Sequence, residues 1–189
     1  MSSTAPLPRP LPSRSLLTLG GALLLALAGP AHAVDWSLSG GLSEKHSVKK
    51  AGIIAGWNRA EPLWAGQKWE LALRHELELA YWDVPKAKDN IIEAGYSPIL
   101  RFQQRATGDG ARFFAEASIG LRLLSHTHIT PTRTLSTAFQ FSDVIGAGVQ
   151  WGPQARSTLG VRIQHLSNAG IKRPNPGINF AQIYYTHRF

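Results

Sequence analysis

The chain has 189 residues and a formal net charge of +8 at pH 7, and it contains no cysteine. This length suits a single domain, and the absence of cysteine leaves no disulfide to hold the fold. A basic chain could bind nucleic acid. Its N-terminus predicts export, however, and this favours anionic lipid as the partner, with no nucleic acid.

The first 33 residues have the pattern of a secretory signal peptide. Arg9 and Arg14 precede an apolar run at 16–28, and the small residues Ala31 and Ala33 flank the expected cleavage site. The run of roughly 13 apolar residues is short for a retained membrane anchor, which needs about 20. The sequence therefore predicts a cleaved signal peptide at 1–33 and a mature chain at 34–189.

The mature chain has no apolar stretch long enough for a transmembrane helix. It is therefore either a soluble exported β protein or a barrel that closes all its backbone hydrogen bonds in lipid. Alternation of apolar and polar residues predicts eight strands. They cover 34–44, 51–57, 68–82, 91–104, 112–124, 135–151, 156–168 and 178–189.

The third segment decides between these classes. Apolar side chains occupy one face, and charged side chains, including Arg74, Glu76 and Glu78, occupy the other. A soluble sandwich would not normally crowd so many charges on one strand face, whereas an apolar exterior around a polar interior fits a membrane barrel. The sequence thus predicts an all-β, eight-stranded antiparallel transmembrane β-barrel of the outer membrane. His75 falls on the apolar face, and the pattern does not explain it.

An even number of strands places both termini on the periplasmic side and the loops after the first, third, fifth and seventh segments outside. Trp82 then lies at an outer strand end, as part of an aromatic girdle. The outer loops are rich in cations, which suit the phosphates of lipopolysaccharide, although a solvated rim without specific contacts would look the same. These cations are Lys45, Lys49, Lys50, Lys86, Lys88, Arg133, Lys172 and Arg173.

His165 and Ser167 close the seventh segment. They share parity with the apolar residues Leu159, Val161 and Ile163, so they are predicted to face lipid, at the outer end of the strand. An ionisable side chain facing hydrocarbon is costly and marks a functional candidate. A His beside a Ser hydroxyl is the core of nucleophilic acyl transfer.

The stretch His165–Lys172, followed by Pro174 and Asn175 and then by the last predicted strand, resembles the PagL family. The resemblance implies an outer-membrane lipid A 3-O-deacylase, a serine esterase that hydrolyses the ester-linked 3-hydroxyacyl chain at position 3 of lipid A in lipopolysaccharide. It implies that His165 is the general base and Ser167 the nucleophile. It also implies an oxyanion site formed by Asn168 with the backbone amide of Ala169 or Gly170.

The family has a Glu fourteen residues after the catalytic His, and here that position is Asn179. An Asn can orient an imidazole through its amide oxygen but cannot offset imidazolium charge. Turn positions predict that His165 lies opposite Asp143 on one neighbouring strand and opposite Asn179 on the other. Asp143, Asn179 or both are therefore candidates to orient His165. The alternative for Asp143 is a bulge that turns it into the barrel.

Lys172 and Arg173, in the connection before the last strand, are candidates to bind a lipid A phosphate. The sequence predicts no cofactor and no metal site, since His126 and His128 have no evident third ligand. A homodimer is conceivable from the resemblance, and nothing in the residues requires one. The competing interpretation is a non-catalytic barrel, structural or adhesive, that acts through its outer loops. In either case the predicted location is the outer membrane, and an active site would face the outer leaflet.

Overall fold

The computed structural model describes residues 34–105, 108 and 110–188. The predicted signal peptide at 1–33 lies outside the described residues, as does Phe189 at the end of the eighth predicted strand. No helix within the described residues is long and apolar enough to cross a membrane.

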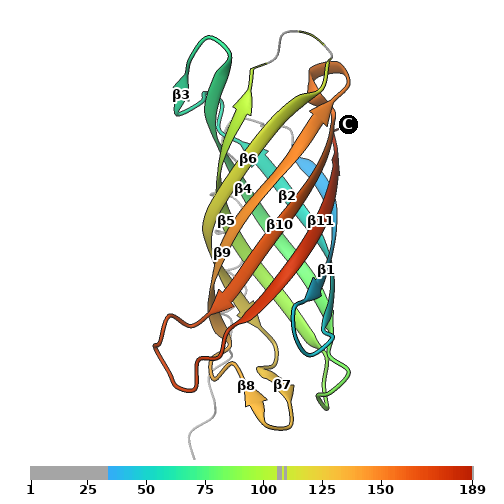
Figure 1. The fold of residues 1–189 in the computed structure, drawn as a ribbon, viewed down its shortest axis with the longest axis vertical. Coiled ribbons are helices and arrows are strands. Elements are labelled where there is room, and N and C mark those ends of the chain that lie inside the picture. The colour runs from blue at the N-terminus through green and yellow to red at the C-terminus, as the bar shows by residue number, and fades with distance from the viewer. Residues whose placement is uncertain (1–33, 106–107, 109, 189) are drawn as a thin grey trace, which may run out of the picture. The chain divides into compact units, whose positions relative to one another are not determined.

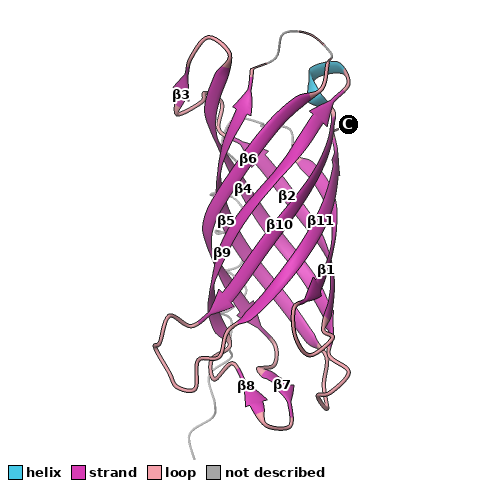
Figure 2. Ribbon diagram, viewed as in Figure 1, coloured by secondary structure: helices cyan, strands magenta, loops and turns pink. Residues whose placement is uncertain are grey.

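Across the described part of the chain, eight long antiparallel strands form a closed barrel (Figures 1 and 2). Each long strand pairs with the long strands before and after it along the chain, and the last strand pairs back with the first, so the eight described long strands close on one another. The strands are β1 (Asp35–Ser43), β2 (Lys49–Asn58), β4 (Trp69–Asp83), β5 (Ile91–Gln104), β6 (Arg112–Leu124), β9 (Phe139–Trp151), β10 (Ser157–Ser167) and β11 (Ile178–His187).

The predicted strands match these eight, and the one large difference in bounds concerns the sixth. It begins at Phe139 rather than at residue 135, because Ser136 has a φ of 65° that interrupts the extended backbone. The residues before it form a small hairpin of β7 (His128–Thr130) and β8 (Arg133–Thr134). The other short elements are β3 (Trp64–Ala65) and the 3-10 turn η1 (Pro153–Ala155).

The loops at 44–48, 84–90, 125–138 and 168–177 gather at one end of the barrel, called here the outer rim (bottom of Figure 1). The C-terminal end of β11 and the connections between β2 and β4, β5 and β6, and β9 and β10 lie at the opposite end. This arrangement agrees with the predicted order of outer loops and periplasmic turns.

The outside of the barrel is apolar, as the alternation predicts. Large hydrophobic side chains on every long strand are exposed, for example Leu38, Leu79, Ile119, Ile145 and Ile183. A band of exposed aliphatic side chains around a closed barrel is the surface that a lipid bilayer would cover.

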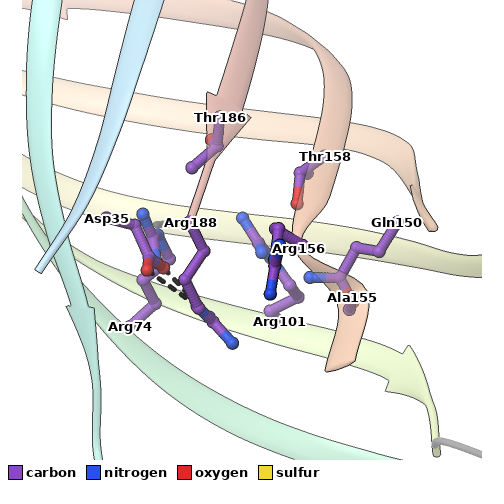
Figure 3. A pocket seen from close by; sticks show the side chains of 9 residues that line it. All are labelled: Asp35, Arg74, Arg101, Gln150, Ala155, Arg156, Thr158, Thr186 and Arg188. Atoms are coloured by element: carbon purple, nitrogen blue, oxygen red, sulfur yellow. Dashed lines mark hydrogen bonds and ion pairs between the residues drawn. The ribbon is translucent and has the colours of Figure 1, made fainter. Parts of the chain in front are cut away.

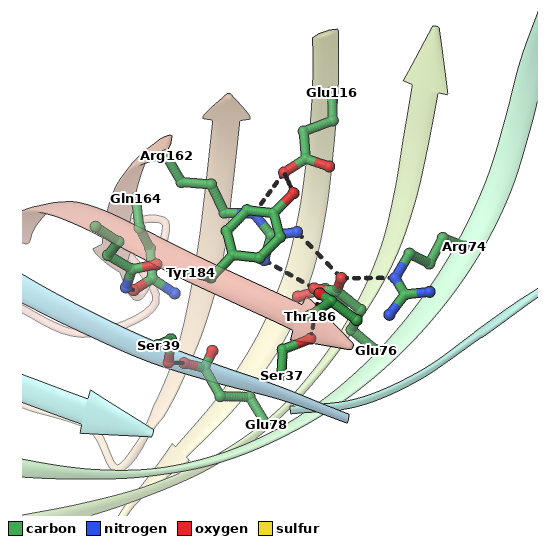
Figure 4. Close-up of polar contacts among 12 residues, drawn as sticks. Ser37, Ser39, Arg74, Glu76, Glu78, Glu116, Arg162, Gln164, Tyr184 and Thr186 are labelled. Atoms are coloured by element: carbon green, nitrogen blue, oxygen red, sulfur yellow. Dashed lines mark hydrogen bonds and ion pairs between the residues drawn. The ribbon is translucent and has the colours of Figure 1, made fainter. Parts of the chain in front are cut away.

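The inside of the barrel is filled by charged side chains that pair with one another (Figure 4). Glu116 is buried and accepts hydrogen bonds from Arg101, Arg162 and the Tyr184 hydroxyl. Arg162 also donates to Glu76, which pairs with Arg74. Because a buried charge is costly without a partner, this pairing is what makes a charged barrel interior stable.

A small polar cavity lies inside the barrel at the end opposite the outer rim (Figure 3). Asp35 pairs there with Arg74 and Arg188, and the free volume is about 10 Å³. That is room for about one water molecule, so this cavity does not accommodate a lipid.

The structure corrects the positions predicted for two residues near the outer rim. Trp82 is not in an outer girdle: it is fully buried inside, where its Nε1 donates to Glu93 at 2.7 Å. Lys50 is not a rim cation, because it points inward and pairs with Glu78 and Glu93. Both side chains have the inward parity of their strands, which outweighs their nearness to the rim.

His75 is accommodated on the apolar face by neighbouring aromatic rings. Its ring stacks on Trp57 with centroids 5.5 Å apart, and its Nδ1 lies 2.8 Å from the Tyr96 hydroxyl. These contacts explain how an imidazole is accommodated on the outward face of β4.

Candidate active site

Four polar side chains form a row across neighbouring strands near the outer rim. His165 on β10 lies opposite Asp143 on β9 and opposite Asn179 on β11, which confirms both predicted registers. Glu44, directly after β1, continues the row because its backbone amide donates to the Asn179 carbonyl. The barrel therefore brings four residues from distant parts of the sequence to one strip of its outer surface.

His165 and Ser167 are the outward-facing residues at the end of β10. Both are half-buried, and Leu166 between them is fully buried on the inner side. The alternation thus places both groups on the lipid-facing side, as predicted, and at the level of the outer rim.

The imidazole of His165 is held through its Nδ1 atom. This atom lies 2.6 Å from Oδ1 of Asn179, and Nδ2 of Asn179 donates to Oε2 of Glu44 at 3.0 Å. Because Oδ1 only accepts, Nδ1 carries the proton and Nε2 has a free lone pair. Within the described residues, neither Nε2 of His165 nor Oγ of Ser167 makes a hydrogen bond, so both remain available to a substrate.

Asp143 faces outward on β9, and the bulge that could have turned it into the barrel is not present in this pairing. Among the residues that the structure describes, its carboxylate makes no hydrogen bond or ion pair. Asp143 is thus a neighbour of His165 in the row without a bonded contact to it.

Asn168 follows the nucleophile position and is fully buried. Its Nδ2 donates to the carbonyls of Leu135 and Lys172, and its Oδ1 accepts the Gly170 amide at 3.0 Å. Asn168 and Gly170 therefore hold each other in the loop. Between them, Ala169 has a φ of 52°, and within the described chain its amide donates no hydrogen bond.

Gly177 is a site residue that the sequence interpretation passed over as part of a turn. It has a φ of 60°, and a Cβ built on it would lie 2.7 Å from Cε1 and 3.3 Å from Nε2 of His165. A side chain at this position would collide with the reactive edge of the imidazole. Its signal in the sequence was the Asn-Pro-Gly turn placed just before the strand that carries Asn179.

Comparison with known proteins identifies the family. The profile described as "Lipid A 3-O-deacylase (PagL)" matches residues 50–188. The chain belongs to the PagL family. It is 38% identical over 133 residues to the lipid A deacylase PagL of Bordetella bronchiseptica, an alignment that covers 67% of this chain and 70% of that protein.

The PagL relative from Pseudomonas aeruginosa is 28% identical over 156 residues, covering 82% of this chain and 86% of that protein. Among solved structures, the crystal structure of the outer membrane enzyme PagL superimposes with a TM-score of 0.74 at 26% identity. It covers 82% of this chain and 99% of that chain. The chain is thus an outer-membrane β-barrel of the PagL family.

A groove beside His165 is a second feature of this PagL-family barrel that was not predicted from the sequence. It has a volume of about 100 Å³, and its lining includes His165, Lys45, His46 and Arg133. Burial, and then the nearby cations Arg133, Lys86 and Lys45, lower the pKa of His46 below its ordinary value. The groove is therefore a cationic surface next to the candidate active site.

Arg133 binds the turn that carries Gly177, since its guanidinium donates to the Gly177 carbonyl at 2.6 Å. Lys172 and Arg173, the predicted phosphate ligands, are exposed on the loop between β10 and β11. Within the described residues, no group of three or more His, Cys, Asp or Glu side chains is arranged to bind a metal ion.

Proposed function

We propose that this barrel hydrolyses the ester-linked 3-hydroxyacyl chain at position 3 of lipid A, with Ser167 as nucleophile and His165 as general base. The observation that carries this proposal is the state of His165 on the lipid-facing surface. Its Nδ1 is bonded to Asn179, its Nε2 lone pair is left free, and the Ser167 hydroxyl lies on the same face two residues further along the strand. A lipid substrate can reach these groups from the outer leaflet without entering the barrel.

The reaction follows from the roles of these two residues. Nε2 of His165 takes the proton of the Ser167 hydroxyl while Oγ attacks the acyl carbonyl carbon. The tetrahedral intermediate collapses when His165 delivers that proton to the 3-oxygen of lipid A, which leaves. Water then attacks the acyl-enzyme, His165 takes its proton, and return of this proton to Oγ of Ser167 releases the fatty acid.

Stabilisation of the oxyanion is assigned to the loop after Ser167. Asn168 and Gly170 remain candidates, although their amides are already bonded within the loop and would have to exchange partners. The amide of Ala169 needs no such exchange, and the loop conformation held by Asn168 presents it. Unchanged kcat in an Asn168→Ala variant would exclude any part for Asn168.

Lys172 and Arg173 are assigned to a phosphate of lipid A. Both are exposed at the outer rim, in the loop that directly follows Ser167. Exposed cations beside the ester would hold the headgroup while its acyl chains lie along the apolar barrel wall.

The deciding experiment is mass spectrometry of lipid A from cells that express the chain, and of lipid A treated with the detergent-solubilised barrel. The native chain removes one 3-hydroxyacyl chain, and Ser167→Ala lowers the rate by at least about 1,000-fold, because the nucleophile is lost. Ser157→Ala is the matched control, since Ser157 lies on the same face at the other end of β10.

Ser157→Ala retains the native rate if the loss of rate in Ser167→Ala comes from removing the nucleophile rather than from removing any outward-facing serine of β10. Unchanged lipid A in both membranes and detergent would instead favour the structural or adhesive barrel, in which neither His165 nor Ser167 has a special role. Equal activity of native and Ser167→Ala proteins would leave the enzyme but reject Ser167 as its nucleophile.

A homodimer is a separate proposal, because every residue assigned to the reaction comes from one chain. Pairing of two barrels through their exposed apolar walls is compatible with the site. The mass of the purified protein in detergent micelles tests it, and a mass of one barrel at all protein concentrations would exclude it.

A further inference from the structure

Glu44 comes directly after β1 and lies beside Asn179. The first and last strands pair with Ser43 opposite Phe180, so the next pair along is Glu44 with Asn179. The Glu44 amide donates to the Asn179 carbonyl at 3.1 Å, which fixes this position. Since β1, β11 and β10 are neighbours (Figure 1), Glu44, Asn179 and His165 occupy successive places in one row.

The side chains of this row make a directed series of hydrogen bonds. The Glu44 carboxylate can only accept, so it binds the NH₂ end of the Asn179 amide, at 3.0 Å. This leaves the amide oxygen for Nδ1 of His165, at 2.6 Å. Without the Glu44 carboxylate, the Asn179 amide could turn over and point its NH₂ group at Nδ1 of His165. Nδ1 would then have to accept a hydrogen bond, and the imidazole proton would move to Nε2.

We propose that Glu44 is a positioning residue of the active site, acting on His165 through Asn179. The inference rests on the proposed Ser167–His165 mechanism and extends it. Glu44 keeps Nε2 of His165 free to accept the Ser167 proton, and through the bonded Asn179 amide it stabilises the imidazolium formed in the reaction. The carboxylate that the PagL resemblance places at residue 179 is supplied here by the residue that directly follows the neighbouring strand β1.

The surroundings of Glu44 support this role. Within the described residues its carboxylate has no ion pair, and Asn179 is its one side-chain partner. Glu44 also lines the groove beside His165. Because Glu44 is exposed, its effect on His165 has to pass through the bonded amide rather than through space, where solvent would screen it.

The test compares kcat and KM of the purified full-length barrel on lipid A in detergent micelles. Glu44→Ala lowers kcat by roughly 10- to 100-fold, the range expected for a hydrogen bond to a charged group, and leaves KM unchanged. Glu44→Gln gives an intermediate kcat, because its amide can accept from Asn179 but carries no charge and does not fix the orientation of the Asn179 amide.

The decisive experiment introduces Glu44→Ala into a variant that already carries Asn179→Glu. There a carboxylate binds Nδ1 of His165 directly, so Glu44→Ala has no cost, and removal of the second carboxylate can raise kcat. Asp89→Ala is the matched control for loss of a rim carboxylate, since Asp89 is exposed in another loop of the outer rim. It leaves kcat unchanged in both backgrounds.

The possible results separate the role of Glu44 from the Ser167–His165 mechanism on which it rests. An equal loss of kcat from Glu44→Ala in both backgrounds would make Glu44 a structural residue and overturn the proposal. Full kcat of Glu44→Ala beside an inactive Ser167→Ala would also reject Glu44, while the proposed function stands. An active Ser167→Ala would reject the proposed mechanism itself. Heat-modifiable migration in SDS gels verifies that each variant is a folded barrel.

Discussion

His165 lies between two polar neighbours, and its contacts with them differ. Asn179 is bonded to Nδ1 at 2.6 Å, whereas Asp143 is its cross-strand neighbour with no hydrogen bond among the described residues. A bonded oxygen fixes both the ring orientation and the tautomer, but an exposed charge without a bond contributes only a screened attraction. The contact at Asn179 is therefore the one that activity should depend on.

Separate alanine substitutions test this difference. Asn179→Ala is expected to lower kcat by roughly 10- to 100-fold, because the imidazole loses the partner that holds its proton on Nδ1. Asp143→Ala should lower kcat by less than about 3-fold, as expected for an exposed charge. The measurement is kcat on lipid A in micelles. A larger loss from Asp143→Ala would transfer the orienting role to Asp143, and full activity of both variants would mean that neither residue orients His165.

The turn before β11 shapes the site through its backbone. Gly177 has a left-handed φ of 60° and approaches the reactive edge of the imidazole. Its carbonyl accepts from Arg133 of the β7–β8 hairpin. A hydrogen bond from the neighbouring loop thus holds the turn beside His165, and only a residue without Cβ fits there.

Substitution of this glycine separates steric from conformational effects. Gly177→Ala is expected to displace the imidazole and lower kcat by about 100-fold, the cost of misplacing a catalytic group by about 1 Å. Gly152→Ala is the control, because Gly152 has a similar φ of 78° but open space around its Cα. Both variants lose stability through a backbone strain of about 1–3 kcal/mol, but only Gly177→Ala should lose activity. Equal kcat for the two would show that the contact with His165 is unimportant.

For the barrel as a whole, local sequence patterns predict most of the fold. Alternation identifies all eight long strands and their lipid-facing sides, and hairpin turns set the pairing of His165 with Asp143 and with Asn179. The interruption at Ser136 was missed because a left-handed residue leaves no mark in the apolar pattern. Lys50 and Trp82 were assigned by their nearness to the rim, although their inward parity was already readable in the sequence.

The active site was predictable only where neighbouring strands are joined by a turn. His165, Ser167 and Asn179 belong to one hairpin, so their proximity follows from the sequence. The contact of Glu44 with Asn179 depends on closure between the first and last strands, which no turn specifies. The groove lined by Lys45, His46, Arg133 and Gly177 likewise brings together three loops whose folded paths the sequence pattern does not determine.

The cations are spread over both ends of the barrel, and we predict that those next to the active site lower KM for lipid A. Lys172 and Arg173 are exposed in the loop that directly follows the proposed nucleophile Ser167. If they bind a lipid A phosphate, the double variant Lys172→Ala/Arg173→Ala raises KM by roughly 3- to 10-fold, as two exposed charge-assisted contacts would supply. Its kcat stays unchanged, because binding of a remote phosphate is the same in the ground state and the transition state.

The phosphate itself distinguishes a specific contact from a general attraction to anionic lipid. With dephosphorylated lipid A, the double variant and the native barrel should have the same KM. Lys68→Ala/Arg105→Ala removes the same charge from exposed residues at the opposite end of the barrel, and it should leave KM unchanged for both substrates. The proposal of a specific phosphate contact is wrong if the double variant raises KM equally for both substrates, or if the control variant raises KM as much as the double variant does. The rim cations would then act only as a non-specific surface charge, whose effect falls as salt is added.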